Sequence, residues 1–342
     1  MSAAHDLPCA QLNAYLRTHL RDGEELTEIE KCPGGQSNPT YKLTTRSSRY
    51  VLRRKPAGQL LPSAHAVDRE FRVMTALRGS PVPVARPLLY CADSAVIGSE
   101  FYVMEYVDGH VYWDPALPGV GAAIRPRIYD EMNRVLAALH QLDPALLGLG
   151  DYGRPAGYFA RQIRRWTDQY RGSETNPRPE IERLIAWLPG SIPADGGQAV
   201  VVHGDFRLDN MIFDESGNVL ALLDWELSTL GHPYADLAYQ CAQWRLPAGS
   251  LRGLNGVDRS TLGIPSEDAY VAAYLDRRGR PDSITGWEFY LVLSLFRLAA
   301  ICQGVYRRGL DGNASSNTAL DFGPKVDVIA GKALAIMAAV EH

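Results

Sequence analysis

The sequence predicts an α+β protein with a small strand-rich lobe followed by a larger, mostly helical lobe. Up to about residue 107, short segments alternate apolar and polar side chains, whereas later segments repeat apolar side chains every three or four positions. A chain of 342 residues suits two domains or one two-lobed unit. We therefore expect lobes at 1–107 and 108–342, with Asp108-Gly109 as the hinge between them.

In the first lobe, the predicted order is a short amphipathic segment, three strands, one helix and two strands. The strands alternate in hydrophobicity between glycine or serine turns, and the helix repeats apolar residues at spacings of three and four. The expected segments are Leu12–Leu20, Glu25–Lys31, Thr40–Thr45, Arg49–Arg54, the helix Ser63–Leu77, Pro87–Ala92 and Phe101–Val107.

In the second lobe, helical periodicity dominates and only short apolar strands interrupt it. The expected helices are Ile124–Leu142, Tyr158–Tyr170, Glu180–Trp187, Tyr234–Trp244, Ser266–Arg278, Trp287–Val305 and Lys325–Val340. The expected strands are Ala199–Val202, Met211–Phe213 and Val219–Leu223.

Composition excludes several classes of protein. A net charge of −4 is unlike the strong positive excess of bulk nucleic-acid binders, so neither a nucleic-acid nor a membrane partner is expected. The five cysteines form no C-x-x-C pair, which argues against zinc clusters and thioredoxin-type chemistry. With neither a leader-like N-terminus nor an uninterrupted apolar stretch of about 18 residues, we expect a cytoplasmic protein.

The densest polar cluster runs from His203 to Asn210 and follows an apolar strand. A second apolar strand ends at Asp224, nineteen residues after Asp205. Phosphoryl transfer needs one carboxylate to orient a hydroxyl and accept its proton, and oxygen ligands to hold magnesium on the phosphates. If the loops bring Asp205, Asn210 and Asp224 together, they supply that set. Turns and helix caps are the alternative roles of such residues.

These motifs resemble the H-G-D-x-x-x-x-N and downstream Asp motifs of the aminoglycoside phosphotransferase and choline kinase superfamily. The longer runs 203–214 and 223–233 look most like phosphotransferase-like domains related to the N-terminal part of some acyl-CoA dehydrogenase family proteins. The resemblance implies a protein-kinase-like fold, a nucleotide substrate (ATP, with GTP as the alternative), Mg²⁺ and a functional link to acyl-CoA metabolism.

Roles carry over by position within these motifs. Asp205 is similar to the family's catalytic base, and Asn210 and Asp224 resemble its magnesium ligands. His203 matches the residue that supports the catalytic loop. Asp236 matches a position that braces this loop by hydrogen bonds.

In the first lobe, the resemblance implies a nucleotide site. Arg53 aligns with the family lysine that grips the phosphates, Glu70 is its expected ion-pair partner, and Lys55 is an alternative grip on the same strand face. The loop expected to cover the phosphates and the hinge expected to contact the purine are Gly34, Gly35, Gln36, Ser37 and Asn38, and Met104, Glu105, Tyr106 and Val107.

For the acceptor, residues 154–183 carry seven arginines against four acids, which favours an anionic substrate over a polycationic antibiotic. The expected substrate is a hydroxy acid or its coenzyme A thioester. An aminoglycoside or choline-like amino alcohol is the alternative, as is a non-catalytic nucleotide-binding module. A solvated helix face would also explain the arginines. The candidate acceptor contacts are Arg207, Asp209, Glu226, Arg161 and Arg165.

Overall fold

The computed structural model divides the chain into two compact units, which are treated separately below. Unit 1 comprises Met1–His110, Ile212–Asp214 and Leu220–Leu227, and unit 2 comprises Val111–Met211, Glu215–Val219 and Ser228–His342. The predicted lobe boundary after residue 107 stays a prediction. The described residues are 7–20, 23–32, 38–56, 66–194, 199–249, 251–280, 283–314 and 318–341.

Unit 1 is built on a five-stranded sheet in the order β1-β2-β3-β5-β4, with every neighbouring pair antiparallel. The predicted order of three strands, one helix and two strands is present. The helix begins later than expected, and residues 57–65 lie outside the described part of the chain. The bounds are α1 Cys9–His19, β1 Glu28–Lys31, β2 Thr40–Thr44, β3 Arg49–Arg54, α2 Val67–Leu77, β4 Pro87–Cys91 and β5 Phe101–Glu105.

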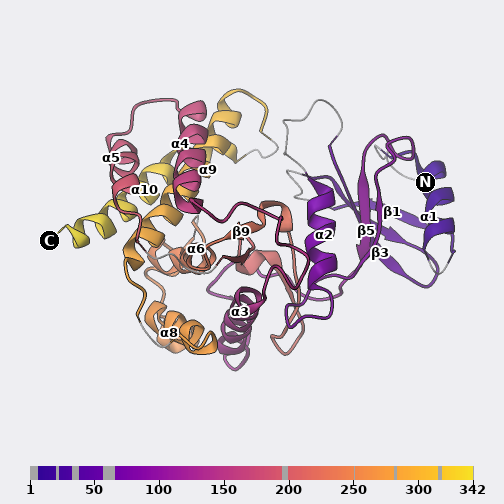
Figure 1. Ribbon diagram of the computed structural model, residues 1–342, viewed down its shortest axis with the longest axis horizontal. Helices are drawn as coiled ribbons and strands as arrows, with labels where there is room; N and C mark the ends of the chain where they lie inside the picture. The colour runs from indigo at the N-terminus through magenta and orange to yellow at the C-terminus, as the bar shows by residue number, and fades with distance from the viewer. Residues whose placement is uncertain are drawn as a thin grey trace. The chain divides into compact units, whose positions relative to one another are not determined.

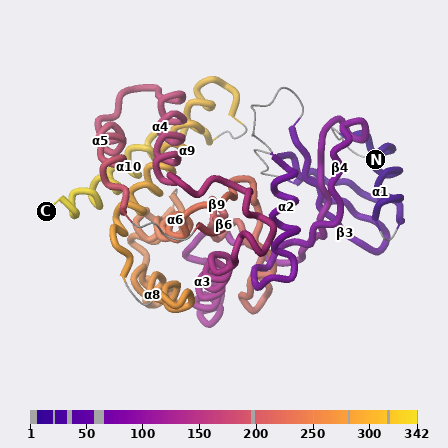
Figure 2. Tube along the Cα trace, in the orientation of Figure 1, coloured from indigo at the N-terminus to yellow at the C-terminus, as the bar shows by residue number. Residues whose placement is uncertain are grey.

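Helices α1 and α2 lie on opposite sides of this sheet (Figures 1 and 2). One face forms an apolar core with α1, in which Leu12 and Leu16 pack with Tyr41 and Leu52 of the sheet. Because side chains alternate along a strand, the neighbours of these core residues project to the α2 face. Arg53 of β3 is such a neighbour, and it therefore faces the side that carries α2.

A hairpin distant in sequence completes unit 1. Strands β7 (Met211–Phe213) and β8 (Val219–Leu222) pair with each other, and His110 forms a bridge with Phe213. A Cβ at Gly109 would lie 2.5 Å from Ile212 Cγ2 and 2.6 Å from the Phe213 carbonyl oxygen, so only glycine fits there.

Unit 2 is mainly helical, with α9 packed against α4, α6 and α10, and α3 packed against α8. Strands β6 and β9 form a short antiparallel pair, and β9, α7 and the 3₁₀ turns were not predicted. The bounds are α3 Ile124–Gln141, α4 Tyr158–Ser173, α5 Pro179–Trp187, β6 Val200–Val202, β9 Thr229–Gly231, α6 Tyr234–Arg245, α7 Arg259–Leu262, α8 Glu267–Arg277, α9 Trp287–Leu310 and α10 Phe322–Val340.

Helix α9 is largely buried within unit 2. By length and composition alone it could cross a membrane, with a mean hydropathy of 1.6 over its most apolar window. However, 72% of that window is buried inside the protein, as in the core helix of a globular fold. Such a helix is weak support for a membrane span.

Candidate active site

The loop after β6 is fixed by one buried carboxylate. Asp236, in the first turn of α6, accepts hydrogen bonds from the backbone nitrogens of His203 (2.6 Å) and Gly204 (2.9 Å). Its Oδ2 also lies 3.4 Å from Nε2 of the buried His140. Burial raises the pKa of Asp236, but the bond to His140 and the other donors outweigh burial, so that pKa lies below its ordinary value. The ionised Asp236 carboxylate therefore holds this loop through its hydrogen bonds to the backbone.

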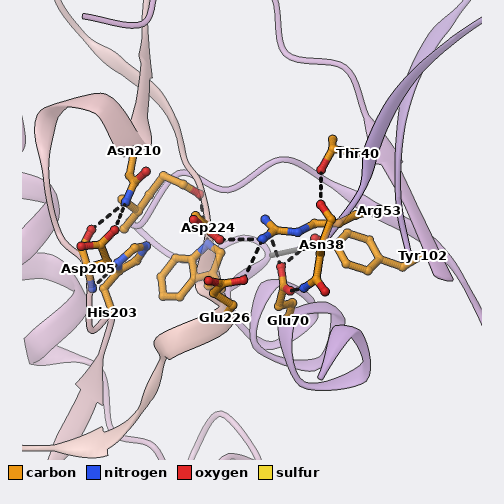
Figure 3. Close-up of polar contacts among 12 residues, drawn as sticks. Asn38, Thr40, Arg53, Glu70, Tyr102, His203, Asp205, Asn210, Asp224 and Glu226 are labelled. Atoms are coloured by element: carbon orange, nitrogen blue, oxygen red, sulfur yellow. Dashed lines mark hydrogen bonds and ion pairs between the residues drawn. The ribbon is translucent and has the colours of Figure 1, made fainter. Parts of the chain in front are cut away.

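Asp205 and Asn210 face each other across the turn that follows. The amide nitrogen of Asn210 donates to the Asp205 backbone oxygen (2.8 Å) and to its carboxylate Oδ2 (2.9 Å), as Figure 3 shows. The Asp205 backbone nitrogen donates to Nδ1 of His203 (3.2 Å). Asn210 thus holds the carboxylate through its nitrogen, which leaves its amide oxygen to serve as a ligand.

The environment of Asp205 is electropositive. Burial raises its pKa, but the charges of Arg207 and Arg297 outweigh burial, so the pKa of Asp205 lies below its ordinary value. Nε of Arg207 lies 3.7 Å from the carboxylate. Tyr239 of α6 also hydrogen-bonds Asp205, and burial raises the pKa of this phenol. Asp205 is consequently an ionised carboxylate at neutral pH.

In unit 1, a second polar cluster is centred on Arg53. Its guanidinium forms ion pairs with Glu70 (3.3 Å), Asp224 (2.7 Å) and Glu226 (3.2 Å), and Figure 3 shows these three carboxylates around it. The predicted ion pair between Arg53 and Glu70 is present. Burial opposes the charge on Arg53, but the three acids outweigh it and raise the pKa of Arg53 above its ordinary value. Asp224 has a positive φ of 64°, which is unusual for a residue other than glycine.

Glu70 is the most deeply buried carboxylate of this cluster. Its two oxygens accept hydrogen bonds from the Asn38 side-chain nitrogen (2.8 Å) and the Tyr102 hydroxyl (3.0 Å). Burial raises the pKa of Glu70 to about 7 despite the opposing charge of Arg53. These contacts place Asn38, which ends the predicted phosphate loop, within the same cluster.

The alternative grip, Lys55, has its own partner. Its ammonium lies 2.8 Å from the carboxylate of Glu100. The predicted hinge begins in β5, where Glu105 pairs with Arg86 at 3.1 Å. Purine contacts by Met104–Val107 stay a prediction, and the residues Gly34, Gly35, Gln36 and Ser37 lie outside the described part of the chain.

The predicted metal ligands belong to different units, Asn210 to unit 2 and Asp224 to unit 1. Their convergence on one ion therefore stays a prediction. Among the described residues, no group of three or more His, Cys, Asp or Glu side chains could hold a metal ion. An amide oxygen and one carboxylate nevertheless suit Mg²⁺, which takes few protein ligands and fills its remaining positions with phosphate oxygens and water.

Several arginines of the 154–183 stretch have structural partners. Arg171 pairs with Glu182, Arg178 donates to Asp327 at 2.6 Å, and Arg161 donates to the backbone oxygens of Arg154 and Ala156. The alternative explanation, that these arginines lie on a solvated helix face, therefore fits part of this stretch. Arg165 differs because it contacts Trp166 face-on, 5.3 Å from the ring centre.

Beside the catalytic loop lies a cavity of about 70 Å³ in unit 2. Its walls include Arg207, Asp209 and Arg252, and Asp209 pairs with Arg207 at 2.6 Å and with Arg252 at 3.4 Å. Larger cavities of about 360 and 440 Å³ in this unit are lined by none of the predicted site residues. The smaller cavity is thus the better candidate for acceptor binding.

Sequence reasoning missed four residues of these clusters: His140, Tyr239, Arg297 and Tyr102. The first three lie in helices and reach this cluster only through tertiary contacts, His140 with Asp236, Tyr239 with Asp205 and Arg297 with Tyr239, so no local motif could identify them. Arg297 alone carried a detectable signal, a single cation in the middle of a long apolar helix.

Comparisons with known proteins agree with this geometry. The phosphotransferase enzyme family model matches residues 28–290. Mouse acyl-CoA dehydrogenase family members 10 and 11 are 47% and 44% identical over 322 residues, which is 93% and 91% of this chain. The chain spans only 30% and 41% of the length of these two relatives.

Solved structures give the same result. A Ralstonia eutropha protein whose name places it provisionally among the aminoglycoside phosphotransferases is 48% identical, with a TM-score of 0.87 over 96% of this chain and 98% of its own. Spectinomycin phosphotransferase, solved with ADP and spectinomycin, shares the fold at 14% identity, with a TM-score of 0.64 over 96% and 98% of the two chains. The predicted kinase-like α+β fold is confirmed, and the chain belongs to the phosphotransferase enzyme family.

Proposed function

We propose that this protein is an ATP- and Mg²⁺-dependent kinase that phosphorylates a hydroxyl group of a small molecule. The observation that carries this proposal is the Asp205 carboxylate, which Asn210 holds within a loop braced by Asp236. A structural aspartate would need no such arrangement of an ionised carboxylate, an amide and a cationic surround.

In the proposed reaction, the acceptor hydroxyl donates a hydrogen bond to Asp205. The hydroxyl oxygen attacks the γ-phosphorus, the bond from this phosphorus to the β,γ-bridging oxygen breaks, and ADP leaves with the bond's electron pair. The hydroxyl proton passes to Asp205. Because the pKa of Asp205 is low, this carboxylate orients the hydroxyl in its ionised form and takes the proton late in the reaction.

Two clusters would bind the nucleotide and its metal. Arg53 would contact the phosphates, since guanidinium binds phosphate oxygens in a bidentate manner. The Asn210 amide oxygen and the Asp224 carboxylate would hold Mg²⁺. When bound, this ion neutralises negative charge on the phosphates.

The acceptor that we propose is a hydroxy acid or its coenzyme A thioester. The cavity beside the catalytic loop contributes two arginines and one aspartate, a balance that suits an anion better than a polycation. The relatives' names refer to acyl-CoA dehydrogenases, which supports a link to acyl-CoA metabolism. The provisional name of the Ralstonia protein supports an aminoglycoside as the alternative acceptor.

The test compares Asp205→Asn with the wild-type protein on a panel of hydroxy acids, hydroxyacyl-CoA thioesters, choline-like amines and aminoglycosides, with ATP or GTP and Mg²⁺. We expect Asp205→Asn to reduce phosphate transfer at least ~100-fold, in the range typical of a lost general base, while Mg-ATP still raises the melting temperature. Asp143→Asn, an exposed turn residue, serves as the control and should retain full activity. Turnover of Asp205→Asn at the wild-type rate would contradict the proposal.

A second candidate function follows from Arg53. This guanidinium already has three carboxylate partners, so a nucleotide must compete with them for it. Under that hypothesis the protein is a nucleotide-binding module without catalytic activity. Mg-ATP binding without turnover across the whole panel would favour it over the kinase.

A further inference from the structure

One partly buried cation of unit 2, Arg297, has guanidinium nitrogens without a hydrogen-bond partner among the described residues. Arg297 lies midway along α9, and its Nε and Nη2 atoms are buried without a hydrogen bond to any described residue. A buried cation without a counter-ion is strongly destabilising, so such groups are normally paired or bind a ligand. The position of Arg297 therefore suggests a function other than stability.

A second cation, Arg165, contacts the same indole ring. The guanidinium carbons of Arg297 and Arg165 lie 5.0 and 5.3 Å from the ring centre of Trp166. Desolvation lowers the pKa of Arg165, and the charge of Arg297 lowers it further. The Arg165 residue is exposed, and no ion pair with a described carboxylate is found for either arginine. Two like charges that act on each other favour the binding of an anion near both.

Arg297 also lies near Asp205. Arg297 stacks on Tyr239 at 4.3 Å, and Tyr239 hydrogen-bonds Asp205. The charge of Arg297 acts on Asp205, but the two residues form no ion pair. Arg207, by contrast, is paired with Asp209 at 2.6 Å. Arg297 is thus close to the catalytic carboxylate but still has donors for a ligand.

The space around Arg297 limits what can bind there. A cavity of about 20 Å³ between α4 and α9 is lined by Arg297, Trp166, Gln162 and Ser294, among others. A cavity of this size holds about one water molecule. It therefore has room for one oxygen atom of an anionic group, with the rest of that group and the ligand's body outside the cavity.

We propose that Arg297 and Arg165 form a subsite for an anionic oxygen group of the acceptor substrate, a carboxylate or a phosphate, with its hydroxyl at Asp205. This inference rests on the proposed function and deepens it. A free hydroxy acid would supply the carboxylate, and the coenzyme A part of a thioester would supply the phosphate. The subsite explains why an apolar helix carries an arginine at this point.

The competing explanation is structural. Arg297 lies between Tyr239 and Trp166, and such cation–π contacts contribute to helix packing. A structural role predicts that Arg297→Lys and Arg297→Met lower the melting temperature without changing anion binding. A subsite predicts that anion binding changes even where the melting temperature does not.

The experiment measures binding by calorimetry without nucleotide, so that it stands apart from the turnover test. The probes are 3-hydroxybutyrate, its coenzyme A thioester, coenzyme A alone and the neutral butane-1,3-diol, followed by inorganic phosphate. The proteins are wild type, Arg297→Met, Arg297→Lys and Arg165→Met. Arg164→Met is the matched control because Arg164 is an exposed neighbour on the same helix. Arg53→Gln, in the predicted nucleotide site, identifies any phosphate bound there.

We expect at least one anionic probe to bind the wild-type protein and Arg297→Met to weaken that binding about tenfold or more. Arg165→Met should act in the same direction, Arg297→Lys should be intermediate, and Arg164→Met should match wild type. Loss confined to 3-hydroxybutyrate identifies a carboxylate subsite, and loss for coenzyme A alone identifies a phosphate subsite.

Two results would overturn the proposal: equal anion affinity in wild type and Arg297→Met, or no binding of any anionic probe to the wild-type protein. Neither depends on phosphate transfer. If anions bind as expected but no probe is phosphorylated, the subsite stands and the proposed function fails. If phosphate transfer occurs and Arg297→Met leaves both KM and anion affinity unchanged, the proposed function stands and the subsite fails.

Discussion

Replacing Asp236 by Asn should release the catalytic loop while changing the side chain by only one atom. The carboxylate accepts the backbone nitrogens of His203 and Gly204 at the same time. An asparagine side chain has one acceptor oxygen, so it can keep only one of these bonds. Losing a charge-assisted hydrogen bond costs about 1.5–3 kcal/mol, and the buried N–H left unpaired costs about 1–3 kcal/mol more. We therefore expect the loop to open more easily by about 2.5–6 kcal/mol.

Hydrogen–deuterium exchange of the amides in residues 200–210 is the direct measurement, because exchange reports local opening without a known substrate. The expected change is ~100-fold or more faster exchange at His203 and Gly204, since about 1.4 kcal/mol corresponds to a factor of ten. Asp108→Asn is the control. Its carboxylate pairs with Arg49 at the surface, where such a pair is worth about 0–1 kcal/mol.

The pH dependence of loop opening adds a second readout. The folded-state pKa of Asp236 is below its ordinary value of 3.8, so its stabilisation is present above about pH 4 and is lost as the pH falls through the folded pKa. The Asn variant should lack this acid-dependent component. If exchange at His203 and Gly204 stays within threefold of wild type, Asp236 does not brace the loop and the reasoning fails.

Two further predictions concern stability. Burial raises the pKa of Glu70 to about 7 from its ordinary 4.5, so the free energy of unfolding should fall by about 3 kcal/mol between pH 4.5 and 7.5. Glu70→Gln should remove this pH dependence in urea titrations. A pH dependence that is the same in wild type and variant would show that Glu70 is ionised throughout. Gly153→Ala should destabilise the protein by about 1–3 kcal/mol because its Cβ would lie 2.2 Å from Thr229 Oγ1, whereas Gly172→Ala, which meets nothing within 4 Å on α4, should be neutral or stabilising in the same melts.

Much of the fold could be predicted from the sequence because its elements have strong local patterns. The strand β3 and the helix α3 alternate or repeat their apolar residues with little interruption, and their predicted bounds are within one residue of those found. Strand β9 was not predicted because three residues, Thr229–Gly231, carry no measurable periodicity. Its pairing with β6 joins segments that are far apart in the sequence, so no short stretch of sequence indicates it.

The candidate site divides in the same way. The contact between Asp205 and Asn210 was predictable because the two residues lie only five positions apart in one loop. The ion pair of Arg53 with Glu70 was predicted. Those with Asp224 and Glu226 were not, since these two acids come from a segment some 170 residues away. The role of Arg297 could not be predicted because its contacts, Trp166 and Tyr239, come from two other helices.

Unit 1 is built from segments that are far apart in the sequence, and this affects how the chain folds during synthesis. Residues 220–227 supply Leu222, which donates its backbone N–H to the Pro83 oxygen (2.8 Å), and they also supply two of the partners of Arg53. During synthesis, the first 110 residues must therefore wait for more than a hundred others before their last contacts can form. On a ribosome stalled at residue 110, Arg53 could pair with Glu70 but with neither Asp224 nor Glu226. For such a nascent chain, the order of translation and the order of folding cannot be the same.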